Sequence, residues 1–428
     1  MVTLKKLRAT DADFEIRFRQ AVAAKDASAA ELESAVLAIL REVKERGDEA
    51  LFAYTKQFDR ISLDKHSVGL PREDMETAYA SIPPEDRDAL SLAAERIEKF
   101  HRRQYQQCSW RDSPNDESVS EVLRPLRRVG LYVPGGKASY PSSVLMTAIP
   151  ARVAGVEEII MVSPGHSPQV LAAARIGGVS RIYRVGGAQA IAALAYGTES
   201  VPRVDKIVGP GNRYVETAKR LLFGAVGLDM LAGPSEVLIL ADDSAVPAFA
   251  AADLIAQAEH DEDAVAAIIG TSETFLAEVE QEAGNQLSRS VRRDIAAKSL
   301  ANNGLMIYTP SMHVAIELAN RMAPEHLELM VRAPREILKG ITAAGAVFLG
   351  DFSPTAVGDY IAGPSHVLPT AGTARFFSPL GVSDFIRRMS VIELSKNELA
   401  ELAPTAVRLA RLEGLDAHAR ALEKRIQH

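Results

Sequence analysis

The chain has 428 residues, with 49 Lys and Arg against 56 Asp and Glu, and a formal net charge of -7. Hydrophobic residues at 47% and charged residues at 25% exclude disordered, collagen-like and disulfide-rich classes. The excess of acidic residues argues against nucleic-acid binding. No apolar run reaches the roughly 18 residues of a membrane span, and the single cysteine, Cys108, cannot form an internal disulfide. We therefore expect a cytoplasmic protein of two or three domains that acts on small molecules.

The first hundred residues are predicted to be mostly helical. Residues 28–45 and 74–105 carry apolar residues at helical spacing, with charges between them. Ser28 followed by Glu31 forms a capping-box pattern at the start of the first of these helices. The polar stretch at 110–120 interrupts the pattern and is expected to be a linker.

From Val129 onward, short β-rich runs alternate with glycine turns and alanine-rich helices. The predicted strands are 159–162, 181–185, 206–208, 237–241, 265–269, 305–308 and 346–349. The predicted helices are 168–176, 188–196, 213–223, 246–259, a long one from Ser272, and 312–322. This alternation is typical of parallel sheets with crossover helices and predicts two α/β units, with a separate helical tail from about Ser383.

One short sequence occurs twice. Residues 232–238 and 362–368 differ at a single position, where Glu236 in the first copy corresponds to His366 in the second. Two interpretations stay open: a recurrent turn whose backbone is set by Gly and Pro, or two equivalent loops directed at one site.

Gln257 and His260 share one face of a predicted helix because they are three residues apart. An amide oxygen and an imidazole suit a borderline divalent ion such as zinc, although glutamine is an uncommon ligand. The alternative is a solvated helix end at which His260 compensates the helix dipole. From the pair alone, this second interpretation is the better supported.

Pro324, Glu325 and His326 are predicted to begin another helix. Neighbouring side chains on a helix point about 100° apart, so Glu325 and His326 could act as two separate bases but not as one relay. An acidic first turn explains Glu325 without any catalytic role. It does not explain His326, which gains nothing at a helix start.

The last quarter of the chain holds weaker signals. Asp359 and His366 lie seven residues apart in a loop rich in Gly and Pro, and His418 follows Glu413 in the tail. The chain has no Gly-x-Gly-x-x-Gly after a strand, no Gly-x-Ser-x-Gly turn and no Walker loop. Cys108 has no neighbour placed to lower its thiol pKa, so we expect an incidental thiol.

Taken together, the order and spacing of several motifs closely resemble the histidinol dehydrogenase family. These motifs are residues 129–136, 209–212, 232–236, 257–260, 323–327, 358–370 and 372–375. The resemblance extends from about Asp48 to His418, and it is the whole set, rather than any one motif, that is specific.

The resemblance implies oxidation of L-histidinol through L-histidinaldehyde to L-histidine, with two NAD molecules and zinc, as the last step of histidine biosynthesis. It implies one zinc ion per subunit, with the ligands Gln257, His260, Asp359 and His418. His326 would be the base that removes the alcohol proton and assists the second hydride transfer, and Glu325 would activate water.

Further contacts follow from the same resemblance. The implied substrate contacts are Ser235, Gln257, His260, His326, Asp359, His366, Glu413 and His418. The implied NAD contacts are Tyr132, Gln189 and Asn212. A homodimer is also implied, in which the tails cross over so that Glu413 and His418 complete the partner's site. Thr355 stands where the family pattern has an acidic residue.

The predicted fold class is therefore α/β, with two Rossmann-like parallel-sheet domains, a helical N-terminal segment and a small C-terminal helical tail. We divide the chain into an N-terminal segment at 1–22, a first α/β domain at 23–131 plus 236–382, an NAD-side α/β domain at 132–235, and a tail domain at 383–428. The alternatives are a related NAD-dependent dehydrogenase of another polar alcohol and, with less support, a zinc hydrolase or a metal- or imidazole-binding protein.

Overall fold

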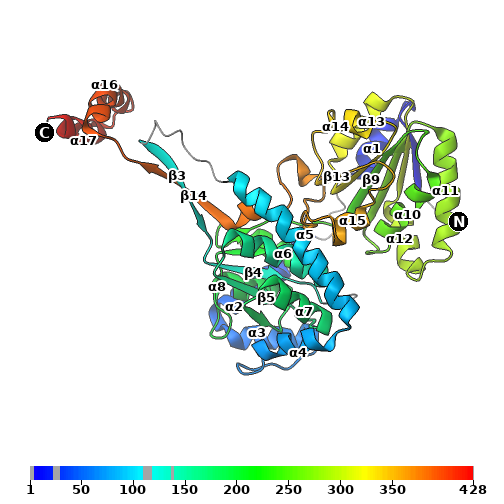
Figure 1. The fold of residues 1–428 in the computed structure, drawn as a ribbon, viewed down its shortest axis with the longest axis horizontal. Helices are drawn as coiled ribbons and strands as arrows, with labels where there is room; N and C mark the ends of the chain where they lie inside the picture. The colour runs from blue at the N-terminus through cyan, green and yellow to red at the C-terminus, as the bar shows by residue number, and fades with distance from the viewer. Residues whose placement is uncertain (1–3, 23–28, 109–117, 136–138, 428) are drawn as a thin grey trace.

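The computed structural model of the chain describes residues 4–22, 29–108, 118–135 and 139–427. They form two lobes and a long projection that ends in a pair of helices (Figure 1). We call the lobe made of residues 4–22 and 236–361 the split lobe. The lobe made mainly of residues between 29 and 228 is called the nested lobe, because its sequence lies between the two parts of the split lobe.

The split lobe contains a fully parallel sheet. Its strands are β1 (Lys5–Arg8), β9 (Glu236–Ala241), β10 (Val265–Gly270), β11 (Leu305–Tyr308), β12 (His326–Met330) and β13 (Ala346–Leu349), in the order β1-β11-β10-β9-β12-β13. Its helices are α1 (Phe14–Val22), α10 (Pro247–Ala258), α11 (Glu273–Leu287), α12 (Arg293–Asn303), α13 (Met312–Met322), α14 (Pro334–Leu338) and α15 (Thr355–Tyr360). Buried residues of α10, α11 and α12 pack on one face of this sheet, and those of α1 and α13 pack on the other.

The nested lobe repeats this plan. Its strands are β2 (Gly69–Leu70), β4 (Arg128–Tyr132), β5 (Glu158–Val162), β6 (Arg181–Tyr183), β7 (Lys206–Val208) and β8 (Gly227–Leu228), in the order β2-β6-β5-β4-β7-β8. Its helices are α2 (Ala29–Arg46), α3 (Asp48–Asp59), α4 (Arg72–Ser81), α5 (Pro84–Cys108), α6 (Pro141–Ala154), α7 (Pro168–Gly177), α8 (Gly187–Tyr196) and α9 (Arg213–Leu221). Only the edge strand β2 runs antiparallel to its neighbour among the described strands of this sheet.

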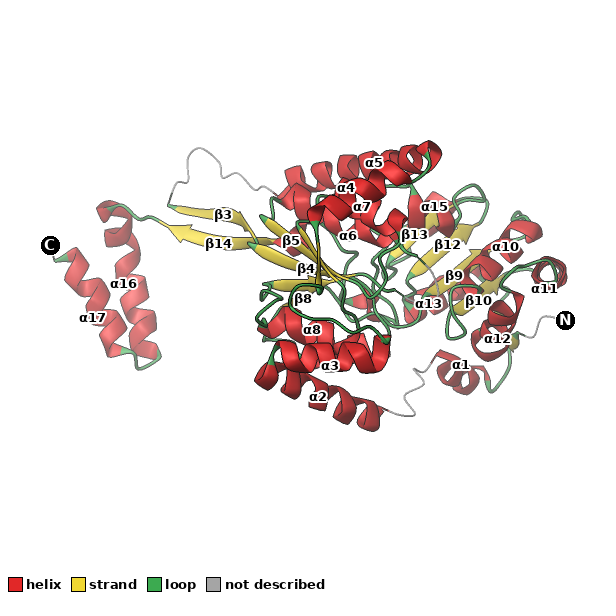
Figure 2. Ribbon diagram, turned by 90° about the horizontal axis from the view of Figure 1, so that it is seen from below, coloured by secondary structure: helices red, strands yellow, loops and turns green. Residues whose placement is uncertain are grey.

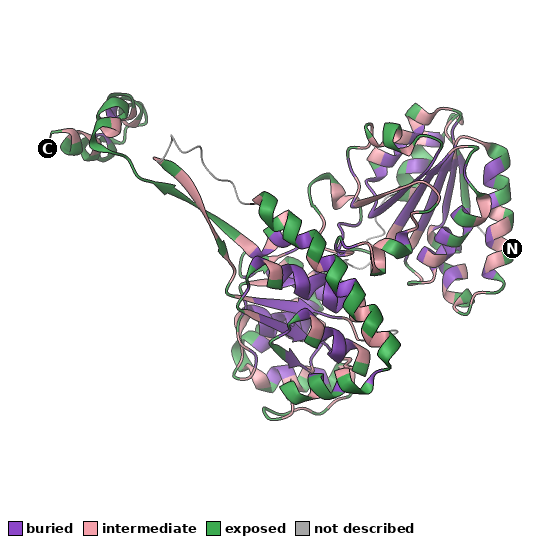
Figure 3. Cartoon of the chain, viewed as in Figure 1, coloured by how far each residue is buried: buried purple, intermediate pink, exposed green. Residues whose placement is uncertain are grey.

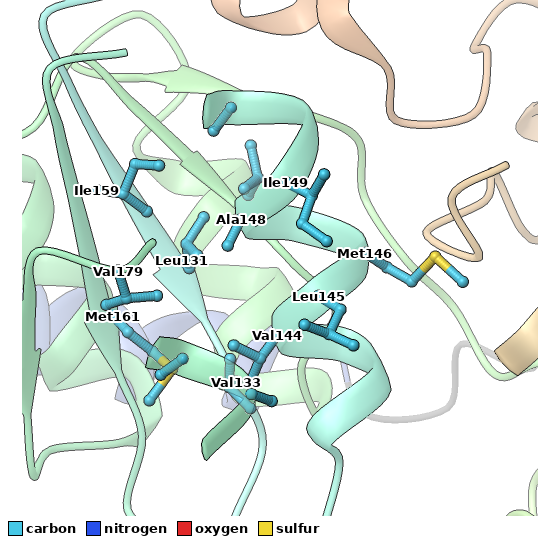
Figure 4. Packing of buried hydrophobic residues seen from close by; sticks show 14 of the residues in the cluster. Leu131, Val133, Val144, Leu145, Met146, Ala148, Ile149, Ile159, Met161 and Val179 are labelled. Carbon is cyan, nitrogen blue, oxygen red and sulfur yellow. The ribbon is translucent and has the colours of Figure 1, made fainter. Parts of the chain in front are cut away.

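The nested lobe has a core on each face of its sheet. Helices α4 to α7 pack on one face, and α2, α3, α8 and α9 pack on the other (Figure 2). On the first face, Leu131 and Met161 of the sheet lie against Val144 and Ala148 of α6 (Figure 4). These strands are apolar on both sides because both faces of the sheet are covered, as expected for a parallel sheet.

Local sequence explains where several helices begin. Ser167, Ser272 and Ser311 each accept a hydrogen bond from the backbone N–H three residues further on, which satisfies one of the free donors at a helix start. Gly155 and Gly178 end α6 and α7 in the left-handed conformation, which glycine adopts without strain.

The projection consists of an arm and a tail. Strand β3 (Val119–Pro125) pairs antiparallel with β14 (Ile386–Ile392) to form the arm, and the tail consists of α16 (Lys396–Leu412) and α17 (Asp416–Ile426). Two short 3₁₀ turns, Thr373–Arg375 and Val382–Phe385, precede β14 in the chain. Most of the projection is exposed (Figure 3). No helix in the described ranges is long and apolar enough to cross a membrane.

The structure confirms the α/β class and the two parallel sheets. In both sheets the central strands follow the Rossmann order. The direction in which successive strands are added to the sheet reverses between β4 and β7 in the nested lobe and between β9 and β12 in the split lobe. The packing differs from the predicted grouping of domains. Helices α2 to α5 were grouped with residues 236–382, but their buried side chains lie in the nested lobe, whereas residues 4–22 pack on the split-lobe sheet.

Two local predictions are wrong. The single helix predicted at 74–105 is two helices, because Pro83 and Pro84 disfavour the helical conformation of the residues before them. Residues 326–330 are strand β12 and not a helix. The predicted cap Ser28 and most of the predicted linker at 110–120 lie outside the described residues.

Candidate active site

The candidate site lies where strand ends of both lobes meet. In the nested lobe these are carboxyl ends: Tyr132 ends β4, and Gly209 directly follows β7. In the split lobe they are amino ends: Glu236 begins β9, and His326 begins β12. The nested lobe therefore contributes the strand ends at which parallel sheets usually bind ligands, whereas the split lobe contributes the opposite ends.

The backbone of one residue, Glu236, holds the two candidate bases. The N–H of Glu236 donates to Oε2 of Glu325 at 2.7 Å, and Nδ1 of His326 lies 2.9 Å from the carbonyl oxygen of Glu236. A carbonyl oxygen can only accept, so Nδ1 of His326 carries a hydrogen, and Nε2 is the free nitrogen of the neutral ring. Only 6% of Glu325 and 5% of His326 are exposed.

Glu325 and His326 are closer together than the predicted helix would allow. Oε2 of Glu325 lies 3.5 Å from Nδ1 of His326, and Nε2 at the other end of the ring lies 3.7 Å from Oδ1 of Asp359. Burial lowers the pKa of His326, but the nearby carboxylates of Glu325 and Asp359 outweigh it and raise this pKa well above its usual value. Burial raises the pKa of Asp359, and the contact with His326 reverses this to a net lowering.

Three of the four residues expected to bind zinc approach the site. Gln257 is in the last turn of α10 and His260 follows that helix, which runs back from the carboxyl end of β9 to the amino edge of the sheet. Asp359 lies on α15, and the charge of His260 contributes to the lowered pKa of Asp359. Gln257 is 4% exposed, and its Nε2 is buried without a hydrogen-bond partner among the described residues.

The fourth expected ligand is elsewhere. His418 lies exposed on α17 of the tail, far from α10 and α15 (Figure 1). Glu413, an expected substrate contact, is exposed at the end of α16. No group of three His, Cys, Asp or Glu side chains within the described ranges is placed to hold a metal ion. The amide of Gln257, the His260 imidazole and the Asp359 carboxylate are donors that suit zinc, so the residues present fit this ion in part.

The repeated sequence occupies two of the crossings between the lobes. Residues 232–238 lead from the nested lobe into β9, and residues 362–368 lead from α15 back to the nested-lobe core, where Val367 is buried. Nδ1 of His366 donates to the Asp359 carbonyl at 2.9 Å, and Nε2 of His366 lies 3.2 Å from Oγ of Ser143. The side chain of Ser235 is half-buried in the first crossing.

The expected NAD contacts border one cavity. Tyr132, Gln189 and Asn212 all line a cavity of about 580 Å³ that also reaches His260. The Tyr132 hydroxyl accepts the N–H of Gly187 at 3.2 Å, and burial raises the pKa of Tyr132 to about 12. Both amide atoms of Gln189 are buried and lack partners among the described residues, as expected for a group that binds a ligand. Asn212 caps α9 through Oδ1, so it also has a structural role.

Sequence reasoning missed an ionic cluster beneath these loops. Nζ of the fully buried Lys219 lies 2.8 Å from Asp229 and 3.6 Å from Glu216. Lys219 also donates to the carbonyl of Gly209, whereas Asp229 accepts the N–H of Gly209. Glu216 accepts the N–H groups of Gly211 and Ala232, which joins the Gly209–Asn212 turn to the first crossing. No motif in the sequence indicates this cluster.

A second buried group was also missed. Asp253 of α10 and Glu328 of β12 share a side-chain hydrogen bond, and Oε1 of Glu328 accepts the N–H of Thr355 at 2.8 Å. Two carboxyl groups can form a hydrogen bond only if one of them is protonated. In agreement, burial raises the pKa of Asp253 to about 6 and that of Glu328 well above its usual value. This pair therefore links the three elements that carry Gln257, His326 and Asp359.

Comparisons with known proteins match this chain to one family along almost its whole length. A family model described as histidinol dehydrogenase matches residues 22–426. Histidinol dehydrogenase of Geobacter metallireducens is 49% identical over 429 residues, which cover 99% of this chain and 98% of that protein. The corresponding protein of Geobacter sulfurreducens is 50% identical, with coverage of 97% and 98%. A crystal structure of histidinol dehydrogenase from Elizabethkingia anophelis matches with a TM-score of 0.93 and 34% identity, covering 100% of this chain and 99% of that chain.

Proposed function

The chain belongs to the histidinol dehydrogenase family, and we propose that it catalyses the complete oxidation of L-histidinol through L-histidinaldehyde to L-histidine, with two NAD molecules. The observation that carries this proposal is that the backbone of Glu236 holds both Glu325 and His326, together with a cavity that reaches from Tyr132 to His260. A two-step oxidation needs a base for each alcohol proton and a group that activates water, and these two side chains match those needs.

The raised pKa of His326 favours the charged ring, so the first step begins from its neutral form. Nε2 of the neutral ring takes the proton of the substrate hydroxyl as the C–H hydride leaves, so that the alcohol becomes the aldehyde. The hydrogen bond from Nδ1 to the Glu236 carbonyl supports this role, because it fixes the tautomer and stabilises the positive charge that the ring acquires. Bound NAD would accept the hydride, and bound zinc would hold and orient the substrate as a Lewis acid.

In the second step, the carboxylate of Glu325 removes a proton from water as the oxygen adds to the aldehyde carbon. Protonated His326 returns its proton to the former aldehyde oxygen, which completes the hydrate. The neutral ring then takes a hydroxyl proton from this hydrate as the second hydride leaves, which gives the carboxylic acid. The buried setting of Glu325 supports its role, because it limits the access of bulk water to the carboxylate. Asp359 and His366 would orient the substrate opposite the two bases.

Gln257, His260 and Asp359 would hold the zinc ion, together with His418 of the partner subunit's tail. The distance of the tail from its own lobes supports this arrangement (Figure 1). Glu413 and His418 would thus contact substrate in trans. A homodimer is further supported by exposed apolar residues along the projection, namely Val119, Met389, Ile392, Leu402, Leu409 and Leu412. The proposed location of the protein is the cytoplasm.

The test is the number of NADH molecules formed per L-histidinol consumed, with zinc-loaded protein, excess NAD and limiting substrate. We expect two. A value of one would mean that the aldehyde is released and that the water step attributed to Glu325 does not occur. If no NADH forms although zinc is bound, the substrate is another alcohol and the proposal is wrong.

A further inference from the structure

The cavity that reaches His260 extends far from this expected zinc ligand. It reaches His260 after α10 in the split lobe, and it is also lined by Ile39 of α2 and by Phe58 and Asp59 of α3. Helices α2 and α3 lie on the nested-lobe face that also carries α8 (Figure 2). The cavity therefore has a catalytic end at His260 and a second end formed by α2 and α3. Its volume of about 580 Å³ is within the usual range for a site that encloses a small ligand.

Asp59 gives this second end an unusual polar group. It is the last residue of α3, its side chain is half-buried, and its Oδ2 atom is buried without a hydrogen-bond partner among the described residues. A buried carboxylate oxygen without a donor is costly and rare in folded proteins. Burial raises the pKa of Asp59, and the charge of Asp59 in turn adds to the raised pKa of Tyr132, so the two groups lie near each other.

The orientation of the dinucleotide follows from the reaction and rests on the proposed function. Hydride is transferred beside His326, so the nicotinamide must occupy the catalytic end of the cavity. The adenosine half then extends toward α2 and α3, where Ile39 and Phe58 offer apolar surface to the flat base. Asp59 adjoins these two side chains and is the acidic group at this end of the cavity.

We propose that Asp59 accepts hydrogen bonds from the adenosine ribose hydroxyls of NAD and selects NAD over NADP. The chemistry of the carboxylate carries both parts of the proposal. Its unpaired oxygen matches a hydroxyl donor, and its negative charge repels the 2′-phosphate that distinguishes NADP. A carboxylate commonly has this role in dinucleotide sites, but there it follows a glycine fingerprint that this chain lacks.

The first experiment compares Asp59→Asn and Asp59→Ser with the unchanged enzyme, as zinc-loaded full-length protein at saturating L-histidinol. We expect KM for NAD to rise about tenfold or more, because a hydrogen bond to a charged group is lost. We expect the ratio of kcat/KM for NAD to that for NADP to fall by about the same factor. KM for L-histidinol should stay unchanged. Gln57→Ala, on the exposed side of the same helix, is the control and should leave all these values unchanged.

The second experiment tests the orientation with two fragments of the dinucleotide as inhibitors. Asp59→Asn should weaken inhibition by ADP-ribose and leave inhibition by nicotinamide mononucleotide unchanged. An unchanged preference for NAD in folded, active variants would overturn the proposal, and so would weaker binding of the mononucleotide alone. Failure of the unchanged enzyme to reduce NAD with L-histidinol would instead contradict the proposed function, so the two failures are distinguishable.

Discussion

At the scale of single residues, the site depends on backbone groups as much as on side chains. Glu236 contributes its N–H to Glu325 and its carbonyl to His326, so the backbone of one residue holds both bases. The carboxylate of Glu236 is used elsewhere, because its Oε1 accepts the N–H of Ala371 at 2.7 Å. Substitutions at position 236 that keep the backbone geometry should therefore disturb the bases less than substitutions of the bases themselves.

Replacement of Glu325 should separate the two oxidation steps. Glu325→Gln keeps the shape of the side chain and can still accept the N–H of Glu236, but it cannot take a proton from water. We expect the first hydride transfer to continue while the second slows by about 10²- to 10⁴-fold, so that NADH per L-histidinol falls toward one. Rapid mixing with NAD in excess measures both phases. His326→Gln is the comparison and should slow both steps; equal losses in both steps for Glu325→Gln would contradict the separate roles.

Single residues also show where sequence reasoning reached its limit. Gln257 and His260 could be recognised as a pair because they are neighbours on one helix, and the family pattern added Asp359 and His418. Asp59 and Lys219 carry no comparable signal. What marks Asp59 is the lack of a donor around a buried oxygen. What marks Lys219 is the enclosure of its charge by Glu216, one turn earlier on the same helix, and by Asp229, which follows the helix. Neither property exists before the chain folds.

At the scale of elements, the buried carboxyl pair is the main connection within the split lobe. Asp253 lies one turn before Gln257 on α10, and Glu328 lies two residues after His326 on β12. The N–H of Thr355, which Glu328 accepts, is at the start of the helix that carries Asp359. A threonine serves this bond as well as an acidic residue would, because only its backbone N–H is used.

The pair makes stability depend on pH in a defined direction. Both pKa values are raised above their unfolded values of 3.8 and 4.5, so the folded chain binds the additional proton. The stabilisation is therefore complete below about pH 4 and is lost as pH rises through about 6 and beyond. In Glu328→Gln, the side-chain amide can accept the N–H of Thr355 and donate to Asp253, so neither hydrogen bond requires a protonated carboxyl group. We expect this variant to reduce the loss of unfolding free energy between pH 5 and pH 8 by about 1–3 kcal/mol.

Chemical denaturation at several pH values, with zinc removed from both proteins, measures this difference. Glu278→Gln, on the exposed surface of α11, is the matched control and should leave the pH dependence unchanged. Parallel curves for Glu328→Gln and the unchanged protein would show that the pair does not share a proton.

Elements also differ in how well the sequence predicts them. The alternation of strands and helices after Val129 is visible because each parallel strand is a short apolar run that ends in a glycine turn. Strand β12 lacks this signature, because it follows Ala323 in the left-handed conformation and contains buried His326 and Glu328. Their hydrogen-bond partners come from distant segments, so local sequence suggested a helix start. The arm was not predicted either, because β3 and β14 lie far apart in the chain.

At the scale of the whole molecule, the projection predicts that catalysis requires two chains. We expect mixed dimers of Glu325→Ala and His418→Ala subunits to regain activity, although each variant alone is inactive. In such a dimer, one site receives its tail from the Glu325→Ala chain and its lobes from the other, and is therefore intact. Activity is measured after the two variants are unfolded together and refolded, with each variant refolded alone as the control. Confirmed mixed dimers without activity would show that each tail serves its own chain.

The nesting of the lobes also sets the order in which the chain can fold as it is synthesised. Strand β1 is made long before its partner β11, which begins only at Leu305. The nested-lobe sheet is complete once Leu228 has been made, whereas the split-lobe sheet must wait for β13. Strand β3 has to remain unpaired until β14 is made. The arm therefore closes only after the strands of both lobes have been made, and in the proposed dimer the two subunits would meet after that point.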